Sequence, residues 1–542
     1  MAAKQGNQKW DAEVDVIVVG FGGAGACAAI EAAQQGASVL VLDRFCGGGA
    51  TAGSGAIVYA GGGTEYQKAA GFDDTPEEMY KYLREEVGDC ISDETLRRFC
   101  NGSVDMIKWL VEAGVPFEGS MCPFKTSYPT DDYYIYFSGS ENNGRYKEHA
   151  KPAPRGHRAK GKGISGLTLF HGLEKTIHKN DKIQVSLQTN VQKLVMENGR
   201  VIGVEGRIIK CTFFKHIHKI LSKINLKATT YMPPGAKLMN DICILIEKTM
   251  SRPYRAHARK GVILSAGGFI FNKELVKKHN PIFLRCLPLG TYGDDGTGIR
   301  LGESAGGVTA YMDKMSAWRF YVPPEALMQG VLVDKQGHRV CAEDLYGGKQ
   351  GEFVVNRGGN AYLIIDSDTY KEAVSHLGDQ CASFQKLTQI PSIRLTRKKA
   401  PSFDKLAAKL GMPAKALEDT MSKYNDIASK GQPDPLGKFE KRFKPQVKPP
   451  FYAMDCSLKN FKDTLTKLAL PVAALTLGGL VVDEQTGQVK RQDGSNIEGL
   501  YAAGRNAVGL CSQGYFASGS SIADCVFAGR RAARHAAKQQ AK

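Results

Sequence analysis

The sequence predicts an α/β fold in which the two ends of the chain build one sheet and the middle forms a separate α+β domain. Apolar strands that run directly into glycines occur near the N-terminus, from Lys260 to Phe269 and from Gly499 to Arg505. Such strands are typical of open, mostly parallel sheets. The 542 residues also exceed one ordinary core. We therefore expect one domain over residues 12–280 and 471–542, interrupted by a cap domain over residues 281–470.

The first element is a strand over Val16 to Val19, because an apolar β-branched run is typical of a strand that is buried on both faces. It leads into Gly20, Gly22 and Gly25, which have the spacing G-x-G-x-x-G. The first glycine permits a tight turn, the second lets backbone approach a pyrophosphate, and the third packs a helix against the strand. The alanine-rich helix that follows favours a negative ligand at its N-terminus.

A second strand over residues 38–42 ends at Asp43, whose carboxylate is placed to accept the ribose hydroxyls of an adenine dinucleotide. This order of elements is that of a Rossmann-type site. Small residues from Gly47 to Ala56 allow backbone to lie against a large flat ring, which favours FAD over NAD. The alternative is a glycine-rich turn without a ligand. In this region we expect cofactor contacts from Gly20, Gly22, Gly23, Ala24, Gly25, Asp43, Arg44, Gly49, Ala50, Thr51, Gly53, Ser54 and Gly55.

The composition indicates a globular protein, with 42% hydrophobic and 23% charged residues. Residues 1–13 lack the apolar core of a signal peptide, and the sequence has no apolar span of 18 residues. Thirteen cysteines are scattered without C-x-x-C pairs, so we expect neither a disulfide framework nor a metal site. Free thiols favour a cytoplasmic location.

The net charge of +17 is concentrated in residues 207–260, where 12 basic residues face only two acids, Asp241 and Glu247. No nucleic-acid-binding motif accompanies them, so we expect no nucleic acid partner. A basic amphipathic helix can lie on an anionic membrane surface, and the alternative is a surface helix whose apolar side packs on its own domain. We expect the sequence from Pro233 to Gly235 to break this helix. Apolar residues at helical spacing are Phe213, Phe214, Ile217, Ile220, Leu221 and Ile224, with Lys215, Lys219 and Lys223 on another face.

The remaining elements follow from the same kinds of pattern. Before the basic segment we expect helices over residues 76–87, 93–113 and 163–180, with strands near residues 183–187 and 201–205. In the middle of the chain we expect a strand over residues 329–333, helices over residues 402–410 and 414–429, and a surface connection over residues 438–450. An aromatic cluster from Tyr128 to Phe137 can line a flat apolar pocket or take part in ordinary packing.

Two later segments return the chain to the first fold. Ala266, Gly267 and Gly268 end one apolar strand and bring backbone close to a ligand, and Gly504 and Arg505 end another. A helix then begins near Ser518. The free amides at its start, among Ser520, Ser521 and Ile522, can hold the pyrimidine edge of a flavin or a substrate oxygen.

Together these segments resemble the bacterial superfamily of FAD-dependent fumarate reductases and 3-ketosteroid dehydrogenases across nearly the whole chain. The resemblance rests on the N-terminal fingerprint, GVILSAGGF, GVLVDKQGHRVCAEDLYGGKQG, GLYAAGRN and GYFASGSSIADCVFAGRRAA. It implies a glutathione-reductase-like FAD-binding domain with a catalytic cap domain. Residues 47–55 contain no histidine, so we expect FAD to be held without a covalent bond.

The segment GYFASGSS is similar to the branch that acts at the Δ4 bond of 3-ketosteroids. That branch implies that Tyr346 and Tyr515 act as acid and base, with a tyrosinate as the base. It also implies that Ser518 and the amide of Gly519 hold the C3 carbonyl, and that FAD N5 exchanges a hydride. Fumarate reductases carry a histidine where this chain has Leu475 and its neighbours. A 3-ketosteroid Δ1-dehydrogenase and a reductase of another enoate remain the alternatives.

The partners follow from the same resemblance. We expect a hydrophobic 3-ketosteroid as substrate. No second glycine motif for NAD(P)H is present, so we expect a separate electron acceptor or donor such as a quinone or a small carrier. The segment over residues 207–260 fits a peripheral membrane contact that delivers both. The sequence leaves the direction of the reaction open.

Overall fold

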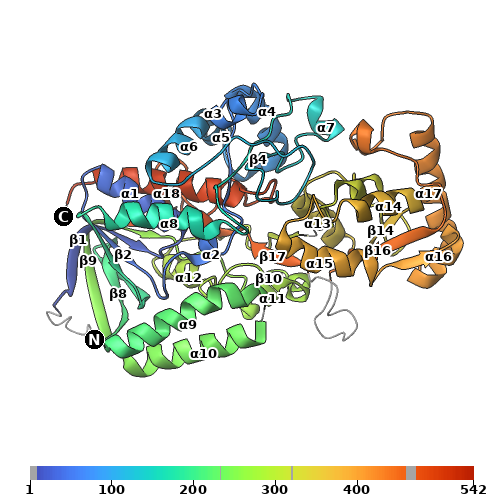
Figure 1. Cartoon of the computed structure of the whole chain (residues 1–542). Coiled ribbons are helices and arrows are strands. Elements are labelled where there is room, and N and C mark those ends of the chain that lie inside the picture. Colours follow the sequence, from blue (N-terminus) through green and yellow to red (C-terminus); the bar gives the residue numbers. More distant parts are fainter. Residues whose placement is uncertain (1–8, 232, 319–320, 459–471, 542) are drawn as a thin grey trace.

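Figure 1 shows the computed structural model of the chain, which describes residues 9–231, 233–318, 321–458 and 472–541. An eight-stranded sheet forms the core of the first domain, in the order β19, β20, β9, β1, β2 and β6, with β8 and β7 continuing from β9. Its strands are β1 (Ala12–Val19), β2 (Val39–Leu42), β6 (Ile183–Ser186), β7 (Thr189–Glu197), β8 (Arg200–Ile209), β9 (Ser251–Leu264), β19 (Gln488–Lys490) and β20 (Asn496–Ala502).

The central strands β20, β9, β1, β2 and β6 are all parallel, so their carboxyl ends meet at one edge of the sheet. The apolar runs Val16–Val19, Val39–Leu42 and 261–264 of these strands are buried, which explains their continuous apolar sequence. Because β20 comes from the last part of the chain and pairs with β9, both ends of the chain build this sheet. The α/β prediction is confirmed.

Three helices lie side by side along one face of the sheet in Figure 1: α1 (Gly23–Gln34), α8 (Gly166–His178) and α18 (Ser520–Lys538). Small residues allow the close approach of α1 and α18, since a Cβ on Gly529 would lie 2.5 Å from the carbonyl oxygen of Ala24. The shorter elements around this domain are α2 (Gly49–Ala52), β3 (Ile57–Tyr59), α3 (Glu65–Ala69), α4 (Pro76–Val87), α5 (Asp93–Asn101), α6 (Ser103–Glu112), β4 (Ile135–Tyr136), α7 (Gly144–Lys147), β5 (Gly156–Arg158), α11 (Lys273–His279), α12 (Thr297–Ser304), β11 (Thr309–Ala310) and β18 (Gly479–Leu480).

The cap contains an antiparallel sheet in the order β13, β14, β16 and β15. A small sheet connects the two parts, because β17 (Ala473–Thr476) pairs with β10 (Leu287–Pro288) and β12 (Met315–Trp318). The division at residues 280 and 470 stays a prediction, and position 470 itself lies outside the described residues. The segments α12 and β11 lie beyond residue 280, but α12 packs on β9 and β11 pairs with β18. The cap elements are β13 (Val331–Asp334), α13 (Gly347–Asn356), β14 (Ala361–Ile365), α14 (Ser367–Ser375), α15 (Ser383–Arg394), β15 (Lys398–Ala400), α16 (Phe403–Leu410), α17 (Ala414–Ser429) and β16 (Phe451–Asp455).

Two predicted helices differ from the structure. The helix expected over residues 93–113 is interrupted at Gly102, which joins α5 to α6. Glycine has the lowest helix propensity apart from proline, and the break lets both short helices turn apolar side chains toward the core. The helix expected over residues 163–180 is the shorter α8, which begins at Gly166.

The basic segment is a helical hairpin of α9 (Thr212–Tyr231) and α10 (Pro233–Met250). The expected break after the first helix is confirmed, but Pro233 also begins a second helix, a position that suits proline because its missing N–H is not needed there. The predicted bounds 207–260 are too wide. Residues 207–209 belong to β8 and residues 251–260 to β9, and these two strands stay paired as far as Ile209 and Ser251. The insertion is therefore limited to the two helices, residues 212–250.

None of the helices within the described ranges is both long and apolar enough to cross a membrane.

Candidate functional site

A cavity of about 560 Å³ opens where the parallel strands end. It begins at the glycine turn after β1 and continues to the boundary between the sheet domain and the cap. Ligands of open α/β sheets bind at this edge. The walls come from β1, β2, α2, α9, α15 and the start of α18, so segments distant in sequence share one space.

The three glycines of the turn have different structural roles. A Cβ on Gly25 would lie 1.9 Å from the carbonyl oxygen of Gly20, so this glycine is required for the helix to pack against the turn. Gly20 has φ +102°, a conformation that other residues rarely adopt. At Gly22 the nearest protein atom to an added Cβ is the carbonyl oxygen of Gly48, at 3.9 Å. Gly22 therefore leaves open space on the cavity side, where a phosphate group can approach the backbone.

Asp43 and Arg44 lie at the end of β2. The Asp43 carboxylate accepts hydrogen bonds from the backbone N–H groups of Phe21 and Phe45, each at 2.8 Å, and so joins the glycine turn to the following loop. It also lines the cavity, and its contact with a ribose stays a prediction. Arg44 lines the cavity as well, but its guanidinium donates to Glu247 at 3.0 Å and to Asp295 at 3.2 Å. Its main observed role is therefore to anchor α10 to the sheet domain.

Most of the other predicted cofactor residues also line the cavity. Thr51 accepts a hydrogen bond from the N–H of Gly23 at 3.0 Å, which links α2 to the glycine turn. Gly25, Gly268 and Ser520 lie behind the wall. The N–H of Gly268 donates to Asp294, and the hydroxyl of Ser520 donates to a carbonyl of the preceding turn. Predicted residues on the wall are Gly20, Gly22, Gly23, Ala24, Asp43, Arg44, Gly49, Ala50, Thr51, Gly53, Ser54, Gly55, Ala266, Gly267, Gly504, Arg505, Ser521 and Ile522.

The predicted catalytic residues come together at the far end of the cavity. Ser518, Gly519 and Tyr515 line it, whereas Tyr346 lies directly behind and is 3% exposed. The hydroxyl of Ser518 donates to the phenol oxygen of Tyr346 at 3.3 Å. The rings of Tyr346 and Tyr515 are 6.0 Å apart, and Trp318 packs on Tyr515 at 4.9 Å. Ser518 and Tyr346 are 172 positions apart in the chain but form a hydrogen-bonded pair between aromatic side chains.

Burial raises the pKa of Tyr346 and of Tyr515 above the ordinary value for tyrosine. The hydrogen bond from Ser518 lowers the pKa of Tyr346, and contacts with Ser520 and Ser521 at the start of α18 lower the pKa of Tyr515. Burial has the larger effect on both pKa values. Both phenols are therefore neutral near pH 7 and can donate a proton or a hydrogen bond. A tyrosinate, the form expected for the base, is disfavoured in this environment.

The walls around these residues are apolar. Tyr128 comes from the predicted aromatic cluster, while Trp318 and Phe384 carried no functional signal in the sequence. Leu475, at the position compared above with the histidine of fumarate reductases, also lines the cavity. Among the described lining residues, the cations are Arg44 and Arg505 alone. Arg505 donates to Asp294 at 2.7 Å, so each of these arginines already has an acidic partner. A dicarboxylate would find no unpaired cation on this part of the wall.

The α9 helix contributes a further stretch of wall that the sequence did not indicate. Ser222, Asn225, Leu226 and Thr229 line the cavity beside α2. They recur at helical spacing on the side of α9 opposite to the exposed Phe213, Ile220 and Ile224. The hairpin is thus part of the site as well as part of the surface.

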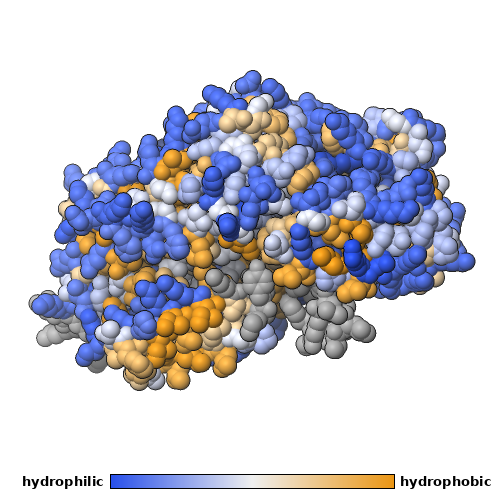
Figure 2. Space-filling model, in the orientation of Figure 1, coloured by the Kyte–Doolittle hydropathy of each residue, from blue (hydrophilic) through white to orange (hydrophobic). Residues whose placement is uncertain are grey.

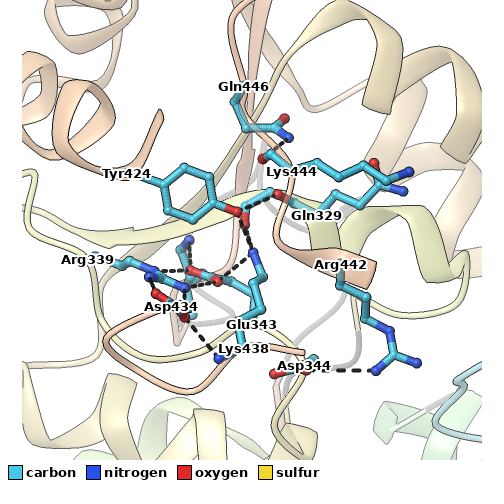
Figure 3. Close-up of polar contacts among 12 residues, drawn as sticks. Gln329, Arg339, Glu343, Asp344, Tyr424, Asp434, Lys438, Arg442, Lys444 and Gln446 are labelled. Carbon is cyan, nitrogen blue, oxygen red and sulfur yellow. Dashed lines mark hydrogen bonds and ion pairs between the residues drawn. The ribbon is translucent and has the colours of Figure 1, made fainter. Parts of the chain in front are cut away.

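A buried cluster of charged residues supports the segment that carries Tyr346 (Figure 3). Glu343, three residues before Tyr346, lies 2.8 Å from both Arg339 and Lys438. Asp344 accepts hydrogen bonds from Asn143 and from the N–H of Phe439, each at 2.8 Å. The cluster fixes the backbone on the N-terminal side of Tyr346.

The same cluster corrects the expectation for residues 438–450. We expected a surface connection there, and Glu440, Lys441, Lys444 and residues 447–449 are exposed, but Lys438, Arg442 and Gln446 are buried. Lys438 and Arg442 can enter the interior because acidic side chains compensate their charges. Composition alone does not distinguish such lysines from solvated ones.

The cavity suits FAD in three respects. The open side of Gly22 and the N-terminus of α1 fit a pyrophosphate, and the small residues of α2 and the following loop leave room for a flat ring. The start of α18 lies at the end where that ring would meet the tyrosines. Within the described residues no group of histidine, cysteine, aspartate and glutamate side chains has the arrangement of a metal site.

Comparisons with known proteins agree with this geometry. The family model for the FAD binding domain matches residues 15–522. The chain is 37% identical over 515 residues to the 3-oxo-5-alpha-steroid 4-dehydrogenase of Comamonas testosteroni, covering 92% of this chain and 93% of that protein. It is 26% identical over 572 residues to a 3-oxosteroid 1-dehydrogenase of Mycolicibacterium smegmatis, covering 96% of each.

Among solved structures, the chain resembles the 3-ketosteroid-delta4-(5alpha)-dehydrogenase of Rhodococcus jostii RHA1 in complex with 4-androstene-3,17-dione. The TM-score is 0.81 at 33% identity, and the match covers 99% of both chains. Since the FAD family model extends over nearly the whole chain and a relative is 37% identical over most of it, the protein belongs to the FAD-dependent oxidoreductase family that includes 3-oxo-5-alpha-steroid 4-dehydrogenase.

Proposed function

We propose that the protein oxidises or reduces the C4–C5 bond of 3-ketosteroids. The observation that carries this proposal is the group of Ser518, Tyr515 and Tyr346 at the apolar end of the cavity. A ketone oxygen needs a hydrogen-bond donor, and the fused rings of a steroid need an apolar wall. The named activities of the relatives from Comamonas testosteroni and Rhodococcus jostii support the same assignment.

In this proposal, Ser518 and the amide of Gly519 hold the C3 carbonyl oxygen and stabilise the negative charge that develops on it. FAD, held by the glycine turn and the start of α18, would supply the acceptor or donor of the hydride at C5. Tyr515 lines the cavity and Tyr346 does not, so we assign the direct proton transfer at C4 to Tyr515 and place Tyr346 behind it. The neutral phenol gives this proton in the reducing direction, and its conjugate base takes the proton back in the oxidising direction.

Two alternatives are less well supported. A 3-ketosteroid Δ1-dehydrogenase would use a similar wall, but the relative of that kind is 26% identical, compared with 37% for the 4-dehydrogenase. A reductase of a charged enoate such as fumarate needs unpaired cations. Arg44 and Arg505, the cations on the described wall, are both paired with acids.

We further propose a separate electron acceptor or donor, a quinone or a small carrier. A cytoplasmic location with peripheral membrane contact through the α9–α10 hairpin completes this proposal. All thirteen cysteines are free, which supports a reducing compartment. Quinones and sterols both dissolve in membranes, so one contact would serve both partners.

An anaerobic titration of the purified yellow protein tests the proposed activity. We expect a 5α-saturated 3-ketosteroid to bleach the flavin absorbance and the Δ4-enone to restore it in the reduced protein. The product of the oxidation should be the 4-ene, identified by nuclear magnetic resonance, and a 1-ene would instead establish the Δ1 alternative. Bleaching or reoxidation by succinate or fumarate but not by steroids would overturn the proposal.

A further inference from the structure

The α9–α10 hairpin is larger than its place in the sheet requires. It joins β8 to β9, which are antiparallel neighbours paired up to Ile209 and Ser251. Two residues are enough to connect such strands. Glu247 of α10 accepts from Arg44 at 3.0 Å and lies 3.3 Å from His218 of α9, so the hairpin is firmly attached to the sheet domain.

The outer face of the hairpin is apolar and exposed, as Figure 2 shows over α9 and α10. Seven of the sixteen exposed large hydrophobic side chains in the described ranges belong to these two helices, so the exposure is concentrated rather than scattered. Phe213 and Leu238 are 66% and 63% exposed. The seven residues are Phe213, Ile220, Ile224, Leu238, Ile242, Leu245 and Met250.

The charges around this face are mostly positive. Lys219, Lys223 and Lys248 are exposed on the same two helices. The two acids of the hairpin are already compensated, because Asp241 lies 2.6 Å from Lys237 and Glu247 is bound to Arg44. A second copy of the face would repel the first, whereas an anionic surface would attract it.

The cap carries a similar element on the other side of the cavity. Phe384, Gln385 and Gln389 of α15 line the cavity, while Leu387 and Leu395, on and just after this helix, are 73% and 70% exposed. Figure 2 shows a second apolar area over α15. Both α9 and α15 thus have an inner side on the cavity and an apolar outer side.

We propose that the outer faces of α9, α10 and α15 dock on an anionic lipid bilayer, and that an apolar steroid passes between the bilayer and the cavity that these helices line. The apolar stripes would enter the boundary between headgroups and acyl chains, with the lysines at the phosphates. The identity of the cargo rests on the proposed function, whereas the docking itself does not.

Co-sedimentation of the FAD-loaded protein with vesicles tests the docking. One set of vesicles contains phosphatidylcholine only, and the other contains phosphatidylcholine and phosphatidylglycerol at a ratio of about seven to three. We expect binding to the anionic set, weakened about tenfold or more in a variant with Phe213→Asn, Leu238→Asn and Leu245→Asn. A variant with Lys219→Glu, Lys223→Glu and Lys248→Glu should lose at least as much, since each lysine near an anionic surface strengthens binding about fivefold.

Control variants carry changes of the same kind on the cap surface. Leu436→Asn removes an exposed leucine outside the proposed face. Lys335→Glu, Lys405→Glu and Lys423→Glu together change the net charge as much as the hairpin triple, at lysines that are also exposed. The controls should bind vesicles like the parent chain. All variants should keep their flavin absorbance and melting temperature, because none of the altered residues lines the cavity.

Equal binding to both sets of vesicles, no binding, or equal losses in the hairpin and control variants would overturn the docking proposal. So would a hairpin variant that altered only the oligomeric state, since the face would then contact a second copy. Steroid turnover is measured separately with detergent-dispersed substrate, where docking is not needed. Failure of the proposed activity therefore remains distinguishable from failure of docking.

Discussion

The phenol of Tyr515 lines the cavity and that of Tyr346 lies behind it, and burial keeps both protonated. We predict that Tyr515→Phe lowers steroid turnover by roughly 10² to 10⁴, the usual contribution of a positioned acid or base. Tyr346→Phe should also lower it, but less. Because the pKa of each phenol is raised, the rate of enone reduction should be independent of pH between about 6 and 9. Stopped-flow reoxidation of the reduced flavin measures both effects.

A suitable control is Tyr501→Phe. Tyr501 is a buried tyrosine of β20 whose hydroxyl lies 3.0 Å from His535, away from the cavity wall. This variant should keep its turnover. Full turnover in both Tyr515→Phe and Tyr346→Phe, with flavin bound, would show that neither tyrosine moves the proton.

In the turn between β1 and α1, one glycine is required for folding and another for binding the cofactor. At Gly25 an added Cβ would lie 1.9 Å from a backbone oxygen, whereas at Gly22 the nearest protein atom is 3.9 Å away. Gly25→Ala should therefore destabilise the fold by about 1–3 kcal/mol or more, the usual cost of overpacking. Gly22→Ala should leave the melting temperature of the FAD-free chain unchanged but greatly weaken FAD binding, because the methyl group occupies the space of the pyrophosphate.

Flavin content and the melting temperature of the FAD-free chain measure the two effects independently. Gly378→Ala serves as a control, since an added Cβ meets nothing within 4 Å and the change should affect neither property. Unchanged FAD affinity in Gly22→Ala would mean that the pyrophosphate lies elsewhere.

At the scale of the whole molecule, the buried charges around Glu343 hold the cap together near the site. Burial alone would raise the pKa of Glu343, but Arg339 and Lys438 outweigh it and hold the pKa below the ordinary value of 4.5. The ionised carboxylate therefore stabilises the fold above about pH 4.5, and this stabilisation is lost as the pH falls through the lower folded value. We predict that Glu343→Gln costs about 3–5 kcal/mol at pH 7 and that the difference from the parent chain shrinks in acid.

Urea denaturation at pH 7 and near pH 3.5 measures this dependence. Glu440→Gln provides the comparison, because the side chain of Glu440 is 69% exposed and its ion pair with Lys147 is long, at 3.6 Å. Surface pairs contribute little, so this variant should be within about 1 kcal/mol of the parent. A constant difference for Glu343→Gln at both pH values would mean that ionisation of this carboxylate does not stabilise the folded chain.

The sequence by itself determined the parallel sheet, the glycine turn and the cofactor class, because these depend on short-range patterns of apolar residues and glycines. The resemblance of its motifs indicated Tyr346, Tyr515 and Ser518. Tertiary structure decided what depends on distance along the chain. It placed Tyr346 behind Ser518, set α9 and α15 on the cavity wall, paired Arg44 with Glu247 and buried Lys438. A local sequence pattern does not indicate which distant residues a side chain contacts. A lysine or an amphipathic helix has the same local sequence whether it faces water, another helix or a ligand.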